Sequence, residues 1–298
     1  MAEITTHIFF SKKVMNKFNC SKSIKYFSLG PDVFYFSNKT KYIGYIMHRK
    51  KTLLFFENYI KYIKNNNLEN NKYVVGSLYG FLTHYILDST IHPYIFYKGG
   101  LHNGMHRVYE MGLSKYIISN NGVNPNEYKI TSDLDIQYND DVIKLLDHVL
   151  KETYNIDNGG KLYYKCINKV KRIYMLFRYD KYGIKKGIYK FIDIFYKKRI
   201  ASASFYNIED VDLNLNHKKW YHPCTKEKYN TSLIDLYNNS LESVYKIINA
   251  VNLVLESKRN IDSLDKIIGN NSLINGLNCD EKHPLKYFEN WHSVSNVI

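Results

Sequence analysis

The stretch KYVVGSLYGFLTHYILDST, residues 72–90, decides the expected fold because it has the pattern of a buried helix. On a helical wheel its large apolar side chains cover most of the circumference, and a helix that is apolar on nearly all sides belongs in a protein interior. One stripe differs, because Ser77, Gly80, His84 and Asp88 follow one another at spacings of three and four residues. Such residues lie above one another on a helix. We therefore expect a central helix with one side that faces polar groups at close range.

The segments around this stretch carry similar but less uniform helical patterns. Apolar residues recur at helical spacing in residues 50–64, 139–153, 161–178, 184–197 and 228–256. Alternation with a period of two is scarce, so the sequence predicts an all-α fold and no sheet. The Asn-rich residues 120–139 are expected to form a long exposed loop. Because the composition is the same on both sides of this loop, we expect residues 1–298 to form a single helical domain.

The composition is that of a basic, soluble protein. The chain has 298 residues, is 45% hydrophobic and carries a formal charge of +14. This charge favours anionic partners such as phosphates, nucleic acid or a lipid surface, although a chain rich in Lys, Asn, Ile and Tyr acquires it from composition alone. The N-terminal residues do not resemble a secretory signal, and the longest uncharged stretch is shorter than the about 18–20 residues that a membrane span needs. We therefore expect a cytoplasmic protein.

The cysteines do not form a recognisable pattern. Cys20, Cys166, Cys224 and Cys279 are scattered and show neither the paired spacing of a cysteine zinc site nor a disulfide framework. Reduced thiols in a cytoplasm are the simplest interpretation.

Two pairs of residues along the chain have the spacing of helical metal ligands. His84 and Asp88 are four residues apart within the buried stretch, and His106 and Glu110 repeat this spacing in HNGMHRVYE, residues 102–110. Side chains at i and i+4 can bind one ion, and a buried carboxylate is costly unless it is paired or bound to a metal. A simple His–Asp ion pair explains the first pair equally well. The repetition favours a metal.

Further candidates lie on either side of these pairs. His92 precedes Pro93, where we expect the first helix to end or bend and the imidazole to turn toward a site between helices. His7 opens an early helix, and His48 precedes the segment 50–64. Asp32 follows a Gly-Pro turn, which holds a carboxylate rigidly. Each alone has an ordinary structural explanation, as a surface residue, a turn residue or a helix cap, and only the set gives them meaning.

In this order the residues resemble the zinc-dependent phospholipase C family, which includes clostridial alpha-toxin and is related to fungal single-strand nucleases. The resemblance spans residues 7–110, about a third of the chain. The later WYHPC, residues 220–224, looks like intracellular members of the family. The resemblance implies an all-α fold with the metal site between helices. It also implies metal ligands at every candidate position, namely His7, Asp32, His48, His84, Asp88, His92, His106 and Glu110.

The resemblance further implies how these ligands share the metals. Asp32, His48 and His84 would bind one zinc, while His92, His106 and Glu110 would bind another. Asp88 would bridge from the first zinc to a second, and His7 would complete the third site beside Asp88. In exported members an N-terminal tryptophan also binds the third zinc, but no tryptophan lies near the start of this chain. Removal of Met1 would leave the amine of Ala2 to replace it, so we expect two or three zinc ions.

The function expected from this resemblance is phosphodiester hydrolysis of the phospholipase C type. A metal-activated water would release the headgroup of a phospholipid, with Asp32 as the acceptor of the water proton. The charge also allows peripheral contact with an anionic membrane. One alternative keeps the metals and replaces the substrate with single-stranded nucleic acid or a soluble phosphoester. A second alternative is a non-catalytic scaffold that metal stabilises.

Overall fold

The structure, a computed structural model, describes residues 3–101, 104–196, 201, 204 and 206–289. It is all-α, as the sequence predicts, with α1 (Ile4–Phe18), α2 (Ser23–Phe27), α3 (Lys41–Met47), α4 (Thr52–Asn65), α5 (Lys72–Gly99), α6 (Met105–Asn120), α7 (Asp140–Tyr154), α8 (Gly159–Phe177), α9 (Ile184–Tyr196), α10 (Leu233–Leu255) and α11 (Asp265–Ile268). The 3₁₀-helices η1 (Gly30–Phe36), η2 (Ile130–Asp133) and η4 (Ile261–Leu264) lie between them. Among these helices, none combines the length and the apolar character needed to cross a membrane.

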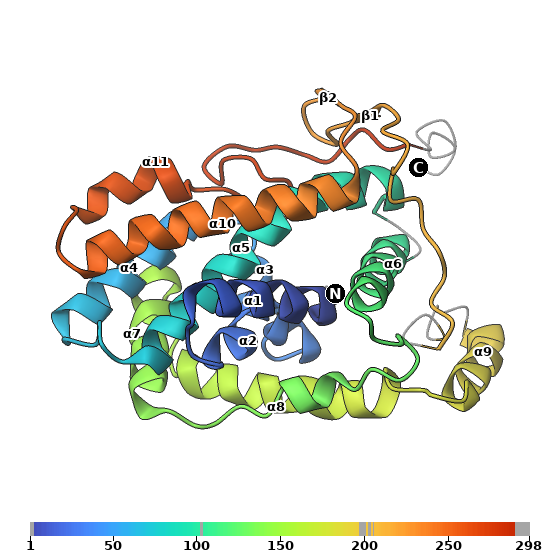
Figure 1. Cartoon of the computed structure of the whole chain (residues 1–298), viewed down its shortest axis with the longest axis horizontal. Coiled ribbons are helices and arrows are strands. Elements are labelled where there is room, and N and C mark those ends of the chain that lie inside the picture. The colour runs from blue at the N-terminus through green and yellow to red at the C-terminus, as the bar shows by residue number, and fades with distance from the viewer. Residues whose placement is uncertain (1–2, 102–103, 197–200, 202–203, 205, 290–298) are drawn as a thin grey trace.

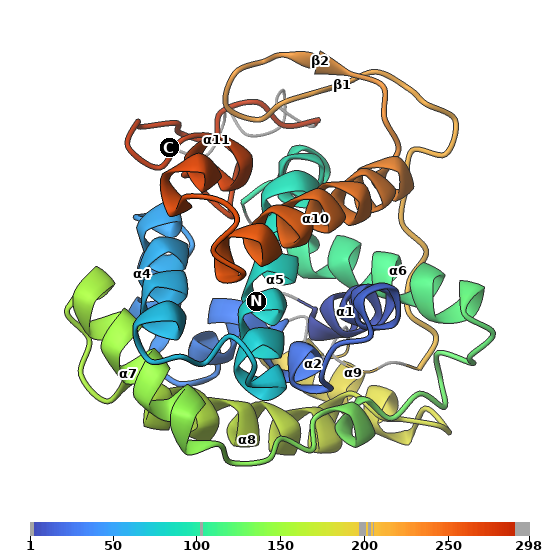
Figure 2. The ribbon, with the colours of Figure 1, turned by 60° about the vertical axis from the view of Figure 1, so that its left-hand side comes forward.

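Helix α5, the stretch quoted first, forms the centre of the molecule (Figures 1 and 2). Helices α1, α2, α4, α6, α7 and α10 all pack against it. The buried apolar side chains form a cluster that extends from Ile4 in α1 to Leu273 after α11, so late segments of the chain complete the same core as early ones.

The polar stripe of α5 is where other backbones approach most closely. A Cβ atom at Gly80 would lie 2.6 Å from the Cβ of Phe27 and 2.8 Å from Ile24 O, so only glycine allows α2 to pack there. His84 lies four residues after Gly80 on the same stripe, and a Cβ at Gly30 in η1 would overlap its ring. The expected close contact of this stripe with polar groups is therefore present, and glycines on both sides permit it.

Helix α5 does not end at Pro93, one of the two outcomes expected there, because it continues to Gly99. Proline lacks the N–H that would bond to Ser89 O one turn earlier. This carbonyl lies against Gly276, where a Cβ would overlap the oxygen and where φ is +70°. A segment more than 180 residues later in the chain therefore packs directly against the helix backbone where the proline leaves this carbonyl without its helical donor.

Two smaller expectations concern the ends of predicted helices, and the first needs correction. Residues 228–256 contain β2 (Lys228–Tyr229), which pairs antiparallel with β1 (Trp220–Tyr221) in a sheet that the sequence does not predict. Helix α10 therefore begins at Leu233, where Ser232 and Asp235 form a capping box. Of the predicted segment 184–197, α9 covers all but Lys197, which lies outside the described residues.

The segment 120–139 is anchored rather than uniformly exposed. Asp133 in η2 is buried and accepts hydrogen bonds from Lys12 Nζ at 2.7 Å, Lys25 Nζ at 2.9 Å and Tyr128 Oη at 2.8 Å. Burial alone would raise the pKa of Asp133, but these hydrogen bonds hold it below its ordinary value. The sequence did not predict this role of Asp133, because residues 120–139 have the composition of an exposed loop.

Candidate metal centre

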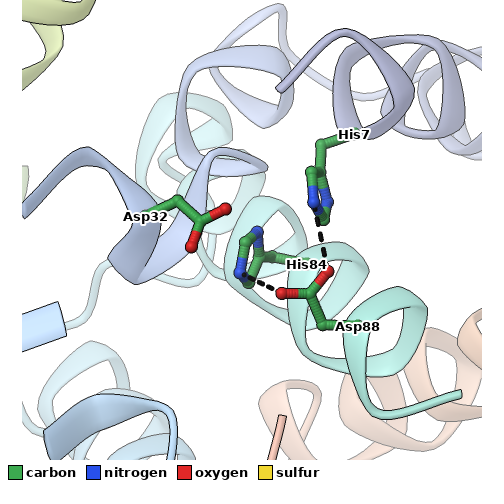
Figure 3. A group of neighbouring side chains, drawn as sticks. All are labelled: His7, Asp32, His84 and Asp88. Atoms are coloured by element: carbon green, nitrogen blue, oxygen red, sulfur yellow. Dashed lines mark ion pairs between the residues drawn. The ribbon is translucent and has the colours of Figure 1, made fainter. Parts of the chain in front are cut away.

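A first group of side chains converges on Asp88 from separate elements of the fold. His7 comes from α1, and His84 and Asp88 come from one side of α5 (Figure 3). His7 Nε2 lies 3.1 Å from Asp88 Oδ1, and His84 Nε2 lies 3.0 Å from Asp88 Oδ2. The rings of His7 and His84 stack with their centroids 4.3 Å apart. Asp88 is therefore enclosed by two imidazoles, and it is completely buried.

Asp32 and His48 complete this group, which we call the inner cluster. Asp32 lies in the first turn of η1, and His48 caps the C-terminus of α3. His48 Nε2 is 3.0 Å from Asp32 Oδ1 and 3.8 Å from Asp88 Oδ2. One ligand atom each from His7, Asp32, His84 and Asp88 falls within 4.8 Å of the others, a spacing that a bound ion requires.

A second group, the outer cluster, joins α5 to α6. Glu110 Oε1 lies 2.9 Å from His106 Nε2 and 3.3 Å from His92 Nε2. The two clusters are neighbours, because His92 Nε2 is also 3.8 Å from Asp88 Oδ1. The side chain of His106 is 20% exposed, whereas those of His92 and Glu110 are buried. The outer cluster therefore reaches the surface at His106.

Backbone carbonyls determine which ring nitrogen faces the carboxylates. His84 Nδ1 lies 3.0 Å from Ser28 O, and His48 Nδ1 lies 2.6 Å from Gly44 O. His92 Nδ1 lies beside Leu273 O in the same way. Since a carbonyl can only accept, each Nδ1 must donate, and a neutral ring then presents the lone pair of Nε2 to the cluster. Two acceptors at 3.0 Å repel each other unless a proton or a cation lies between them.

The buried polar atoms of the inner cluster fit a metal for this reason. Both oxygens of Asp32, both oxygens of Asp88 and Nε2 of His84 make no hydrogen bond of normal geometry to the residues that the structure describes. Buried carboxylates in this situation are costly without a counter-ion. Imidazole nitrogens and carboxylate oxygens together are ligands that zinc prefers. The donor set is therefore suited to zinc.

The electrostatics of the metal-free chain agree with this fit. Burial alone would raise the pKa of Asp88, but the neighbouring histidines, chiefly His84, hold it well below its ordinary value. Burial alone would lower the pKa of His92, yet Asp88 and Glu110 raise it to about 9. The positive charge of the surrounding imidazoles therefore stabilises the carboxylates, and a divalent cation at the same place would stabilise them likewise.

The structure brings all eight candidate ligands together, but two other features of the sequence lie outside the described residues. These are His102, whose role the sequence left open, and Ala2, the expected replacement for the N-terminal tryptophan. Of the aromatic residues after His92, Tyr94 and Tyr97 are buried against Trp220. Only Phe96 touches the outer cluster, with its ring centroid 4.4 Å from that of His106.

WYHPC, residues 220–224, has a structural role at its histidine. His222 Nδ1 accepts hydrogen bonds from the backbone N–H groups of Cys224 and Thr225, while Nε2 lies 2.9 Å from Asn275 O. The ring therefore joins the turn after β1 to the segment that contacts His92. Sequence reasoning missed the carbonyls of Ser28, Gly44 and Leu273 that orient the imidazoles. Every residue has a backbone carbonyl, so no residue type marks the ones that act here.

One comparison with known proteins bears on this site. The family model described as zinc dependent phospholipase C matches residues 6–159, a range that contains all eight candidate ligands. No curated protein and no solved structure matches the chain.

Proposed function

Because this chain belongs to the zinc-dependent phospholipase C family, we propose that it is a zinc-dependent phosphodiesterase that releases the phosphorylated headgroup of a phospholipid. The observation that carries the proposal is that hydrogen-bond acceptors face each other in both clusters, since imidazole Nε2 atoms lie opposite carboxylate oxygens. Imidazoles whose Nδ1 atoms already donate to carbonyls present Nε2 to buried carboxylates at 3.0–3.8 Å. A divalent cation between them would be coordinated by both the nitrogens and the oxygens, and it would supply the Lewis acid that hydrolysis needs.

The eight side chains would divide between the metals as follows. His7, Asp32, His48, His84 and Asp88 would hold the metals of the inner cluster, and His92, His106 and Glu110 that of the outer cluster. Zinc bound there would neutralise phosphoryl oxygens and lower the pKa of bound water toward about 7. The carbonyls of Ser28, Gly44 and Leu273 would keep the imidazoles in the tautomer that binds metal.

Asp32 is the proposed proton acceptor. Its Oδ1 lies 3.0 Å from His48 Nε2, and neither of its oxygens makes a hydrogen bond to the residues that the structure describes. A carboxylate whose second oxygen stays available when the first binds a metal can take up the proton of an attacking water while η1 holds it in place. The rigid Gly-Pro turn before Asp32 supports this positioning role.

Access of solvent favours catalysis over a purely structural site. Structural zinc sites are closed, whereas catalytic sites keep a position for water or substrate. The exposed edge of His106 supplies such an opening beside otherwise buried ligands. We also propose that residues 1–298 act as one domain, which is supported by the packing of α10 on α5 and by the contact of Leu273 O with His92.

Zinc analysis and substrate profiling together test this proposal. We expect two or three zinc ions per chain, and hydrolysis of phosphatidylcholine or phosphatidylethanolamine in detergent micelles that a chelator abolishes and zinc restores. Asp32→Asn should retain the fold and lose turnover. Hydrolysis of single-stranded DNA or of a phosphomonoester, with none of phospholipid, would assign the metals to another reaction. Bound zinc without any hydrolysis would indicate a scaffold.

A further inference from the structure

Helix α9 directs its apolar side away from the protein. Ile184, Ile188, Phe191 and Phe195 follow one another at spacings of four, three and four residues, which places them on one stripe of the helix. We call these four residues the apolar stripe. Each of them is between 54% and 66% exposed, and the neighbouring Ile194 is 73% exposed. A surface helix of a globular protein normally turns such a stripe toward the core, so this orientation is inverted.

The polar side of α9 is the side that attaches it to the rest of the chain. Lys186 Nζ donates to Tyr206 O at 2.8 Å, and Asp193 Oδ2 accepts from the backbone N–H of Ala201 at 2.8 Å. Tyr189 and Lys185 bond in the same way to carbonyls at the end of α8. The inverted orientation is thus held by specific hydrogen bonds and does not follow from loose packing.

The exposed apolar surface extends beyond α9. Met175 and Leu176, whose carbonyls accept the bonds from Lys185 and Tyr189, are 57% and 58% exposed at the end of α8. Tyr182, in the turn between the two helices, is exposed as well. A concentration of large apolar side chains in one exposed region is characteristic of a binding surface, because single exposed residues are normal but groups of them are not.

The charges around the apolar stripe indicate the kind of partner. Helix α9 contains Lys185, Lys186 and Lys190 against a single acidic residue, Asp193. Asp193 is also the residue that holds Ala201, on the attached side of the helix. An apolar stripe with isoleucine and phenylalanine, flanked by lysines, is the pattern of a helix that lies in the interface of an anionic bilayer. Lys190 is exposed and would reach the headgroups while the stripe enters the acyl region, whereas Lys185 and Lys186 add positive charge from the attached side, where they bond to Met175 O and Tyr206 O.

We propose that α9, with its apolar stripe and flanking lysines, is a docking surface for phospholipid bilayers that carry anionic headgroups. Its place in the fold gives this docking a consequence. Lys186 of α9 lines a small cavity together with Val108 and Met111 of α6, the helix that carries His106 and Glu110. Figure 1 shows α6 and α9 at the same end of the molecule. Docking through α9 would therefore turn the end of the molecule that contains α6 and α9 toward the bilayer, and any link between this docking and hydrolysis rests on the proposed function.

Co-sedimentation with vesicles tests the docking surface. The full-length, zinc-loaded chain is mixed with large unilamellar vesicles of phosphatidylcholine, with or without about one third phosphatidylserine, at two salt concentrations. We expect binding to the anionic vesicles that weakens with salt. The double variant Ile188→Asp/Phe191→Asp should bind at least about tenfold more weakly, equal to about 1.4 kcal/mol. Because both side chains are exposed, its circular dichroism, melting temperature and zinc content should match the wild type.

A matched control and a second readout distinguish the outcomes. Leu215→Asp replaces an equally exposed apolar residue, at 56%, on the loop before β1, and should bind as the wild type does. Equal binding by the double variant and the wild type, or no vesicle binding at all, would overturn the proposal. So would a wild-type dimer that the double variant dissociates in analytical ultracentrifugation without any vesicle binding, because the occupant would then be a second copy of the chain. A wild type that binds through α9 but hydrolyses no phospholipid in detergent micelles would refute only the proposed function.

Discussion

Asp88→Asn is the substitution that separates a metal centre from a network of ordinary ion pairs. Asp88 is completely buried, and its oxygens lie 3.1 Å from His7 Nε2 and 3.0 Å from His84 Nε2. The amide keeps the size of the carboxylate and removes its charge, so a loss of metal would not reflect a cavity. The outer cluster keeps all its side chains in this variant. The change should therefore affect one cluster more than the other.

The expected magnitude follows from the linkage between binding and stability. Zinc that binds only the folded state stabilises it by about 2.7 kcal/mol for each site at a free concentration of one hundred times Kd. In large domains about 1 kcal/mol corresponds to 2–4 °C in Tm, so each filled site raises Tm by roughly 5–11 °C. We expect Asp88→Asn to lose about half of the zinc-induced rise in Tm, at least one zinc ion, and nearly all phosphodiesterase activity.

The assay measures Tm before and after zinc is returned to chelator-treated protein, and zinc content by elemental analysis. Asp133→Asn is the matched control, because Asp133 is another buried carboxylate but is paired with Lys12 and Lys25 outside both clusters. It should lower Tm equally with and without zinc. An Asp88→Asn protein with the zinc content and the zinc-induced rise of the wild type would show that Asp88 binds no metal.

Four substitutions test the packing next to the clusters and the wider fold. Gly30→Ala introduces a Cβ that would overlap the ring of His84 at a φ of +50°, so zinc content and Tm should both fall. Gly122→Ala is the control, because Gly122 has a φ of +73° and open space around it. This control should cost only the backbone strain of about 1 kcal/mol. Asp133→Asn should destabilise by about 2 kcal/mol at pH 7 in urea titrations. Because the folded-state pKa of Asp133 is lowered, this difference should be fully present above the unfolded value of about 3.9 and should vanish as the pH falls through the folded value. His222→Ala leaves two backbone N–H groups without their acceptor, so the free energy of unfolding should fall by about 2 kcal/mol, and Tm with it, while the zinc content stays constant. A loss of zinc would show that this histidine belongs to the site.

The sequence predicts best where one residue type has one physical consequence. An apolar circumference requires burial, and α5 is the centre of the fold. A histidine and a carboxylate four residues apart share one side of a helix, and His106 with Glu110 does so at 2.9 Å. The stripe on α5 also predicted close approach, which Gly80 and Gly30 provide. These inferences depend on local geometry alone.

Prediction from sequence was wrong where distant segments decide the local structure. Pro93 should end a helix that stands alone, but Gly276 packs against the carbonyl that the proline leaves without a donor. The spacing of apolar residues predicted α9 as a helix, but it did not indicate which side of the helix bonds to the rest of the chain. That depends on Tyr206 and Ala201, whose backbones bond to its polar side. Leu273 O could likewise not be foreseen as a partner of His92.

The burial of the ligands suggests that the proposed clusters carry different shares of stability and turnover. The inner cluster lies among α1, η1, α3 and α5, and all of its side chains are at most 3% exposed. Metals there would join four elements that are separate in sequence, so their binding energy would act mainly on the fold. The outer cluster joins only α5 and α6 and opens at His106. Solvent would therefore reach the outer cluster first, and Asp88, whose Oδ1 lies 3.8 Å from His92 Nε2, connects it to the inner cluster. Substitution of Asp88 should therefore lower stability and activity together, whereas substitution of Glu110 in the outer cluster should lower activity more than stability.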